Sequence, residues 1–522
     1  MREDRLDSRD DRAAIDGSEP LEPRRPGPPF DTRCAIALSY YTPVNGLPPT
    51  AEPVRRARLR LGARIAAPVL VFGYLTFVRT RGISQTFWLL GDQILYWRIA
   101  LSSWHDIPIG GGFSSVGGTT LGPVFFWTLW AIRHLVGPWT ENLPHAGGIG
   151  LGIIQSAADA CLFAALWKRF SSPLLALAVI LVVATAPYDM ALTATIWNPP
   201  LSVAFVKLSL AIVLFDTAGS LGAQAAATAA AMLAVQAHSS AIFLAAPLIA
   251  AFTAREAFAR RWERAVHSAV VSAAVIALLE LPFLINLVIH RGSGVAPIVV
   301  VDNLSYAVAH PRVIRPIASF RALASACAFI LLRPWTFAWT GAVLVVGALV
   351  TAWRLRRDLV LVCATVVPLI CTVVGFSFWQ RTYDHYWYLV IAPSGALTVA
   401  LALTAWRPAA SVVAAVLALV AVAAQPARVA DAMTIHRLPQ YEPLARGSRA
   451  IRRYTIDVRS IRTEFALPDS TDRTFLFRVL GGRVTPEAKY HATIGPTGAV
   501  TFIPVPGRAA MAADRPASAR AP

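Results

Sequence analysis

One acidic residue, Asp92, follows the first long apolar segment and sits among aromatic side chains in residues 87–98. A carboxylate at the boundary between membrane and water is costly unless something pairs with it or uses it. Partial desolvation there would make it more basic than in water, which suits a general base that deprotonates a hydroxyl group. The structural alternative is an acid that caps the start of an interfacial helix, where the helix dipole favours negative charge.

Three further charges fall inside apolar segments: Asp159, Lys207 and Glu280. Ionisable residues within membrane spans are expensive and pair with one another or line a pathway. Asp159 and Lys207 lie at similar depths when counted at about 1.5 Å per residue, so we expect an internal ion pair. The alternative is a proton or ion path, which would indicate a transporter.

The composition requires a membrane. The chain has 522 residues, of which 56% are hydrophobic and 15% are charged. Its repeated apolar runs of roughly 17 to 22 residues are typical of membrane helices. The net charge of +18 is spread between these runs, which favours cytoplasmic loops and anionic lipid contacts over nucleic-acid binding. The five cysteines are irregularly spaced and predict neither a disulfide framework nor a zinc site.

Positive charge sets the predicted orientation. Arginines at residues 55–64 precede the first span and hold the N-terminus in the cytoplasm, so Asp92 emerges outside. Residues 1–60 are polar and predict a disordered cytoplasmic tail. Residues 80–146 form the first outer loop, and we interpret 121–136 as an interfacial helix, because counting it as a span would put Lys168 and Arg169 outside. The eleven predicted spans are residues 63–78, 147–167, 173–188, 200–215, 221–236, 239–254, 266–289, 335–353, 359–378, 387–405 and 409–425, with an interfacial helix at 317–332.

The C-terminal part differs from the spans. Short apolar runs at 474–479, 492–494 and 498–502 alternate with glycine and proline turns, which predicts strands. With eleven spans, residues 426–505 form a small extracytoplasmic α/β or β domain, and residues 506–522 form a disordered tail. The predicted fold is therefore an all-α polytopic membrane domain over residues 61–425, followed by this small domain with β-strands.

Several short motifs resemble one superfamily. Residues 91–100, GDQILYWRIA, resemble the Asp-Glu-x-x-Tyr-Ala pattern that follows the first span of GT-C membrane glycosyltransferases. These include family-39-like protein mannosyltransferases and the aminoarabinose transferases of lipid A. Residues 121–127, LGPVFFW, resemble their Gly-Pro-Leu-Tyr-Tyr stretch. Trp197-Asn198-Pro199, and the run from Arg381 through Tyr383 to Pro393, fit as well, so the resemblance covers roughly residues 63–405.

The resemblance implies an inverting hexosyl- or pentosyltransferase of the cell envelope. It would use a polyprenyl-phosphate sugar, act on a lipid, glycan or protein acceptor, and lie in the plasma (inner) membrane. Asp92 matches the family's catalytic aspartate. The other site residues we predict are Arg381, Tyr383, His385, Arg291 and Tyr96 for the donor's phosphate or lipid, and Gln93, Asn198 and His238 for the acceptor or for support.

For these other residues the structural alternatives are interfacial anchors, lipid head-group contacts and, for Asn198, the turn that opens a helix with proline in its first turn. The sequence also departs from the family. Gln93 replaces the acid next to the aspartate, and Thr119 and Thr120 stand where some relatives carry Glu or His near Gly122-Pro123. We therefore predict no metal and no cofactor, because Arg or Lys can stabilise a phosphate leaving group. Two other functions stay open: a transporter or flippase of lipid-linked saccharides, and an envelope-assembly scaffold.

Overall fold

The computed structural model describes residues 51–112, 122–193, 195–216, 219–289, 299–311, 314–379, 382–405, 407–435 and 440–506. The chain divides into two units, Met1–Leu59 and Arg60–Pro522, and the second contains every helix and strand after α1 (Ala51–Thr80). Helix α1 begins inside the segment that the sequence predicts as an irregular tail. The rest of that tail, and nearly all of the C-terminal one, lies outside the described residues.

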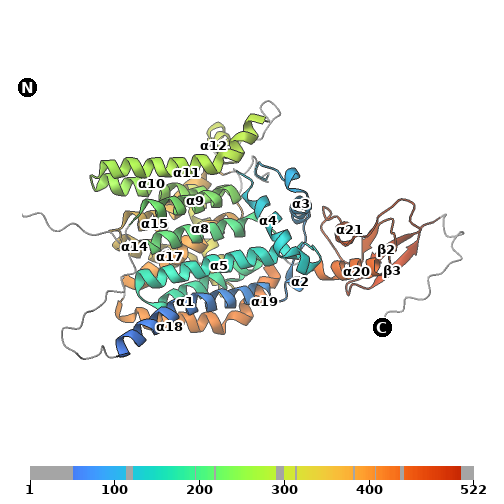
Figure 1. The fold of residues 1–522 in the computed structure, drawn as a ribbon, viewed down its shortest axis with the longest axis horizontal. Coiled ribbons are helices and arrows are strands. Elements are labelled where there is room, and N and C mark those ends of the chain that lie inside the picture. Colours follow the sequence, from blue (N-terminus) through green and yellow to red (C-terminus); the bar gives the residue numbers. More distant parts are fainter. Residues whose placement is uncertain are drawn as a thin grey trace, which may run out of the picture. The chain divides into compact units, whose positions relative to one another are not determined.

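Each predicted span overlaps one or more helices (Figure 1). Seven spans are long and apolar enough to cross a membrane: Leu61–Thr80 of α1, His145–Phe170 (α5), Asn198–Phe215 (α8), Ser239–Phe258 (η3 and α10), Trp262–Ile289 (α11), Leu359–Ser377 (α15) and Asp384–Ala405 (α16, η6 and α17). Two bent pairs raise the number to nine, namely α6 (Pro173–Ala184) with α7 (Pro187–Thr193), and α18 (Arg407–Ala423) with α19 (Gln425–Ile435). The remaining two predicted spans are the shorter helices α9 (Leu221–Ala237) and α14 (Thr340–Arg354).

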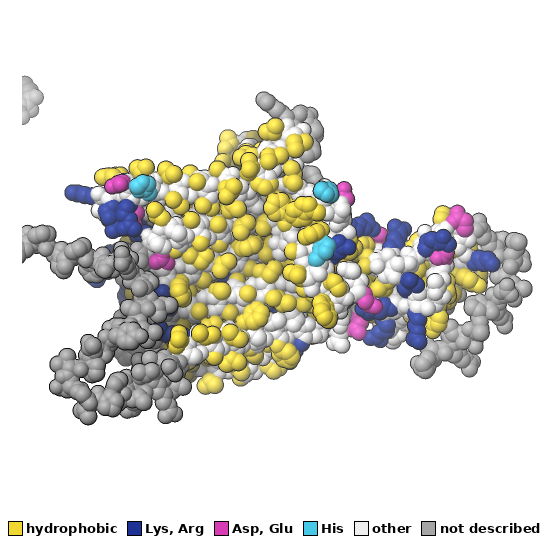
Figure 2. All heavy atoms as spheres, viewed as in Figure 1, with side chains coloured by type: hydrophobic (Ala, Val, Ile, Leu, Met, Phe, Trp, Pro, Cys, Tyr) yellow, Lys and Arg dark blue, Asp and Glu magenta, His cyan; other side chains and the backbone are white. Residues whose placement is uncertain are grey.

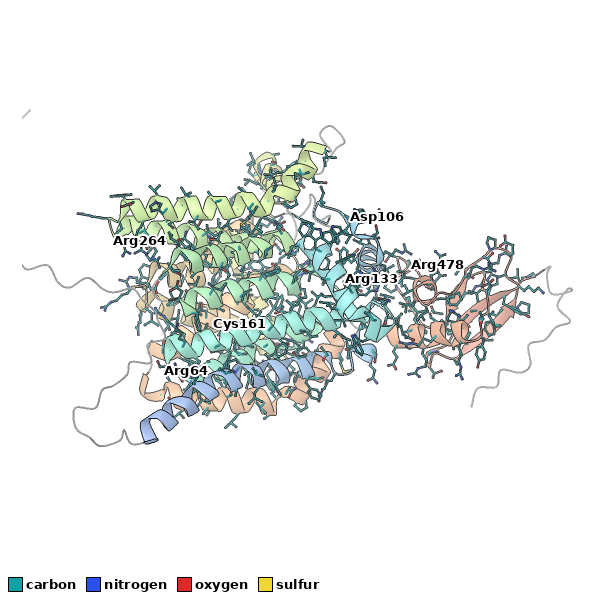
Figure 3. The ribbon with its side chains drawn as sticks, viewed as in Figure 1. Arg64, Asp106, Arg133, Cys161, Arg264 and Arg478 are labelled. Atoms are coloured by element: carbon teal, nitrogen blue, oxygen red, sulfur yellow. The ribbon has the colours of Figure 1, made fainter. Side chains whose placement is uncertain are left out.

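The two ends of the bundle differ in charge and in the elements they carry. Hydrophobic side chains cover the flank between them, as an apolar belt facing lipid requires (Figure 2). Arg64 and Arg264 lie toward one end, here called the basic end, whereas Asp106 and Arg133 lie toward the other, here called the loop end (Figure 3). The loop end carries α2 (Ile83–Thr86), α3 (Gly91–Leu101), η1 (Trp104–Asp106), α4 (Val124–Leu135) and η2 (Gly137–Thr140). Helix α4 has 12 residues, fewer than the roughly 20 that a span needs, as the interfacial interpretation of 121–136 expects.

A ring of buried charges holds four helices together inside the bundle. Lys207 Nζ lies 2.8 Å from Asp159 Oδ1, which confirms the predicted ion pair. Arg79 Nη2 lies 2.7 Å from Asp159 Oδ2 and 2.5 Å from Asp189 Oδ2, and the hydroxyl of Tyr388 donates to Asp189. The four charged side chains are at most 1% exposed, so two cations are balanced by two anions out of contact with water.

Two arginines also satisfy the carbonyls that the bend between α6 and α7 releases. Arg79 donates to the carbonyl oxygen of Ala184 at 3.2 Å, and Arg428 of α19 donates to that of Val182 at 3.0 Å. The bend is 64°. Broken helices are tolerated at membrane depth only where protein groups pair with the freed backbone, so these guanidinium groups stabilise the break.

The C-terminal part begins with α20 (Tyr441–Arg453) and contains a sheet in the order β1-β2-β3. Strand β1 (Ile461–Thr463) pairs parallel to β2 (Tyr490–Ile494), and β3 (Val500–Pro504) pairs antiparallel to β2, with Ala492 opposite Phe502. The strands expected at 492–494 and 498–502 are therefore present. The strand expected at 474–479 is wrong, because helix α21 (Phe475–Val479) lies there. Three consecutive side chains, Phe475, Leu476 and Phe477, are all buried, which a strand with one covered face would not allow.

Candidate functional site

Helix α3 places Asp92 in its first turn at the loop end of the bundle. The buried face of α3 consists of Gln93, Ile94, Trp97 and Ala100, and this face turns Asp92 away from the protein, so its side chain is exposed. The expected partial desolvation of Asp92 is therefore wrong for this structure. Among the described residues the carboxylate forms no hydrogen bond or ion pair, so both oxygens are available to a substrate.

Gln93 fixes the start of α3 rather than facing a substrate. Its Oε1 accepts the backbone N–H of Leu90 at 2.6 Å, and its Nε2 donates to Thr195 Oγ1 at 2.7 Å. The side chain is buried, and it ties α3 to the link between α7 and α8. A second acid at this position would carry charge into a buried pocket, so the glutamine has a structural reason here.

Tyr96 lies one helical turn after Asp92. The centroid of its ring lies 5.1 Å from that of Phe125 and 6.0 Å from that of Phe126, both of α4. Burial and the neighbouring charge of Asp92 raise the pKa of Tyr96 above its usual value, so the phenol stays protonated and can donate a hydrogen bond. Tyr96 therefore lies between Asp92 and the aromatic face of α4.

Four predicted residues from three distant segments gather in one aromatic and imidazole cluster. His385 is at its centre, with ring centroids 4.7 Å from Trp197, 5.5 Å from Tyr383 and 5.9 Å from His238. Asn198 follows Trp197 and donates its amide to the carbonyl oxygen of Ala237 at 2.9 Å. Trp88, four residues before Asp92, packs against Trp197 at 5.9 Å and connects this cluster to the segment of the acid.

His238 has a defined hydrogen-bonding role in this cluster. Its Nδ1 accepts the backbone N–H of Ser240 at 3.3 Å. Burial, with a smaller contribution from His385, lowers the pKa of His238 well below its usual value, so the ring is neutral. The neutral ring with Nδ1 as acceptor carries its proton on Nε2, which makes Nε2 a hydrogen-bond donor. Aromatic faces beside a few placed polar groups are typical of a small-molecule site.

The cationic part of the predicted site is not among the described residues, because Arg381 and Arg291 both lie outside them. In the part of the chain that the structure describes, no group of three or more His, Cys, Asp or Glu side chains is placed to hold a metal ion. Sequence reasoning missed Arg79, Asp189 and Tyr388, the partners of Asp159 and Lys207. Arg79 had the appearance of an ordinary basic residue at the end of a span, so only the fold could reveal its buried role.

The C-terminal part packs directly on the helices around Asp92. Tyr441 of α20 lies 4.8 Å from Phe87 by ring centroid, and its hydroxyl is hydrogen-bonded to His145 at the start of α5. Arg98 of α3 forms an ion pair with Asp472 and lies over the ring of Phe475 at 5.3 Å. One hydrophobic core contains side chains of both the first loop and the C-terminal part, so the two form one structural unit.

The chain has a bundle of long apolar helices, and the short helices of its first loop pack against a small terminal domain. This architecture is that of a multi-pass membrane protein. No protein-family model and no curated protein sequence matches the chain. The solved structures include a similar fold, the crystal structure of ArnT from Cupriavidus metallidurans bound to undecaprenyl phosphate. The similarity has a TM-score of 0.50 at 14% sequence identity and covers 78% of this chain and 84% of that one. The chain therefore shares the fold of that structure, which confirms the GT-C-like fold class that its motifs predict.

Proposed function

We propose that this protein is an inverting glycosyltransferase that moves a sugar from a polyprenyl-phosphate donor to an acceptor hydroxyl, with Asp92 as the general base. The observation that carries the proposal is the fold it shares with ArnT, whose crystal structure holds undecaprenyl phosphate. Two features of this chain add support. Asp92 is exposed at the start of α3. The cluster around His385 is connected to the segment before Asp92, because Trp197 packs against both His385 and Trp88.

The reaction follows from these groups. Asp92 takes the proton of the acceptor hydroxyl as its oxygen attacks the anomeric carbon, and the bond from that carbon to the phosphate oxygen breaks. The polyprenyl phosphate leaves with the bonding electrons, and attack from the opposite face inverts the anomeric configuration. An exposed carboxylate suits this role, because an acceptor must approach it from outside the protein.

The other predicted residues have supporting roles in this proposal. Trp197 and the rings around His385 would pack against the sugar or the first isoprene units, and His238 Nε2 would donate to a sugar hydroxyl. Tyr96 would donate to Asp92 or to the donor, and Gln93 and Asn198 position the loop end. Arg381 and Arg291 would neutralise the leaving phosphate. The sugar is a hexose or a pentose, and the acceptor is a lipid, a glycan or a protein.

The proposed location is the plasma (inner) membrane with the loop end outside. The arginines of the basic end support a cytoplasmic placement of that end by the positive-inside rule, which puts Asp92 and the C-terminal part outside. The flippase alternative would use the charges inside the bundle. The pairing of Asp159, Lys207, Asp189 and Arg79 gives it little support, because these four charges balance one another. Glu280 of α11 lies outside this ring and accepts a hydrogen bond from Gln236 at 3.4 Å, so it is the residue that a flippase would have to use.

The test is Asp92→Asn, with Asp106→Asn as the matched control. Both acids are exposed in the first loop, and Asp106 accepts a local hydrogen bond from Ser103 at 2.6 Å. We expect Asp92→Asn to lower sugar transfer by at least about a hundredfold with unchanged expression, because a general base contributes about 10²–10⁴-fold. Asp106→Asn should transfer at the wild-type rate. Full activity in Asp92→Asn would remove Asp92 from the mechanism.

A further inference from the structure

A cavity at the basic end lies far from the site described above. It has a volume of about 920 Å³ and opens between the ends of α5, α6, α15, α17 and α18 and the residues after α14. Helix α5 runs from His145, beside Tyr441, to Arg169 in the cavity wall, a separation of about 36 Å along the helix. The cavity is within the volume range of small-molecule sites, roughly 300–1,000 Å³.

The polar side of the cavity favours an anion. Its wall contains two arginines, Arg169 and Arg357, against one acid, Asp358. Both oxygens of Asp358 are occupied, since Oδ2 accepts from Arg169 at 3.0 Å and Oδ1 accepts the backbone N–H of Leu361 at 3.1 Å. Arg357 is exposed, and its guanidinium group forms no hydrogen bond or ion pair within the described part of the chain. Its charge is therefore available to a ligand.

Backbone and hydroxyl groups add to this preference. Helices α6 and α15 both begin at the cavity, with Ser172 and Asp358 as their N-cap residues, so the positive ends of two helix dipoles face the same space. The Oγ of Ser172 accepts the N–H of Leu175 at 3.2 Å, which leaves its hydroxyl hydrogen free to donate. Donors of this kind together with arginine are the usual partners of phosphate oxygens.

Part of the remaining wall is apolar. Leu175, Leu361 and Leu401 line the cavity beneath its polar rim. A free inorganic anion would gain nothing from these side chains, whereas an amphiphile would place its head at the arginines and its first methylene groups against the leucines. We propose that this cavity binds the phosphate head group of an anionic membrane lipid at the basic end of the bundle. The assignment is independent of the sugar-transfer proposal.

The experiment uses the full-length protein in nanodiscs or mild detergent, with lipid binding measured by native mass spectrometry. The probes are phosphatidylglycerol, zwitterionic phosphatidylcholine and inorganic phosphate. We expect wild type to retain phosphatidylglycerol in preference to phosphatidylcholine. Arg357→Gln should weaken that binding about tenfold, the typical effect of losing one charge-assisted hydrogen bond.

Arg356→Gln is the matched control, because Arg356 is adjacent and exposed but donates to the carbonyl oxygen of Trp353 and does not line the cavity. It should bind phosphatidylglycerol as wild type does, and Leu401→Trp, which fills the apolar part, should weaken binding without a loss of charge. Equal losses in the Arg356 and Arg357 variants would show attraction to surface charge alone and would overturn the proposal. Displacement of the lipid by millimolar inorganic phosphate, or equal retention of phosphatidylcholine, would overturn it as well.

Discussion

At the scale of single residues, the cluster around His385 consists of neutral groups near the exposed carboxylate of Asp92. His238 is half-buried, its Nδ1 accepts the backbone N–H of Ser240, and its ring packs against those of His385 and Tyr386. A protonated ring in this position would be a buried cation facing a second imidazole. The cluster is therefore built to stay uncharged, which suits hydrogen bonding to a neutral sugar ring.

The neutral state of the His238 ring makes the free energy of unfolding depend on pH. The pKa of His238 is lowered in the folded protein, so below its usual value of about 6.5 the unfolded chain binds a proton that the folded chain does not. The free energy of unfolding should then fall as pH drops below about 6.5, by up to about 1.4 kcal/mol per pH unit from this group. In thermal unfolding between pH 7.5 and 5.5, His238→Gln should lose less stability than wild type. An unchanged slope in His238→Gln would contradict the neutral ring.

The individual candidates could be predicted from the sequence better than their surroundings. Asn198, His238, Tyr383 and His385 stand out as polar residues beside predicted spans, and the structure places them around one centre. Their proximity could not be derived, because it depends on how distant helices pack. The exposure of Asp92 was mispredicted, because Gln93 and Trp97 turn into the core on the buried face of α3, whereas Asp92 does not.

At the scale of elements, the buried charge ring links α1, α5, α7 and α8. Lys207→Met would leave the acids Asp159 and Asp189 with Arg79 as their only cation. Removing one partner of a buried pair costs about 3–5 kcal/mol, so we expect a large loss in the free energy of unfolding or a loss of folded protein.

Two further variants show whether uncompensated charge is the cause. The double variant Asp159→Asn with Lys207→Met should recover part of the loss, because one buried anion disappears with the cation. The control is Arg446→Gln, which breaks the exposed pair with Glu442 and should cost less than about 1 kcal/mol. A double variant no more stable than Lys207→Met alone would contradict this account of the ring.

The contact between α3 and residues 468–473 is the second element that the function depends on. A Cβ atom at Gly91 would lie 3.1 Å from Ser470 Oγ, which is tighter than ordinary packing. Gly91→Val should therefore push the C-terminal part away from the helix that carries Asp92. We expect faster proteolysis of residues 441–506 and a severalfold rise in the KM for the acceptor.

The cause can be isolated with two further variants. Adding Ser470→Gly to Gly91→Val should restore both measurements in part, because it removes the two side-chain contacts and leaves the one to the backbone oxygen of residue 470 at 3.3 Å. Gly73→Val is the control, since nothing lies within 4 Å of a Cβ atom there. If Gly91→Val behaves as wild type, or if the second substitution restores nothing, the close contact does not hold α3 in place.

At the scale of the whole molecule, the apolar runs determine most of the architecture. Each predicted span is helical over most of its length, because a stretch of about twenty apolar residues has few other stable states in a bilayer. The bends at α6–α7 and α18–α19 could not be predicted, since Arg79 and Arg428 stabilise the first of them from distant parts of the chain. The docking of the C-terminal part on α3 was likewise beyond the sequence, because it arises from pairs such as Tyr441 with Phe87.

The most direct test of sugar transfer is product analysis in sealed proteoliposomes loaded with a polyprenyl-phosphate sugar and supplied with hydroxyl acceptors. The account predicts that the wild-type protein releases free polyprenyl phosphate and forms a glycoside of inverted anomeric configuration, and that Asp92→Asn forms neither. If the intact lipid-linked sugar instead crosses the bilayer with no release of polyprenyl phosphate, the protein moves its substrate without cleaving it, and the glycosyltransferase assignment is contradicted.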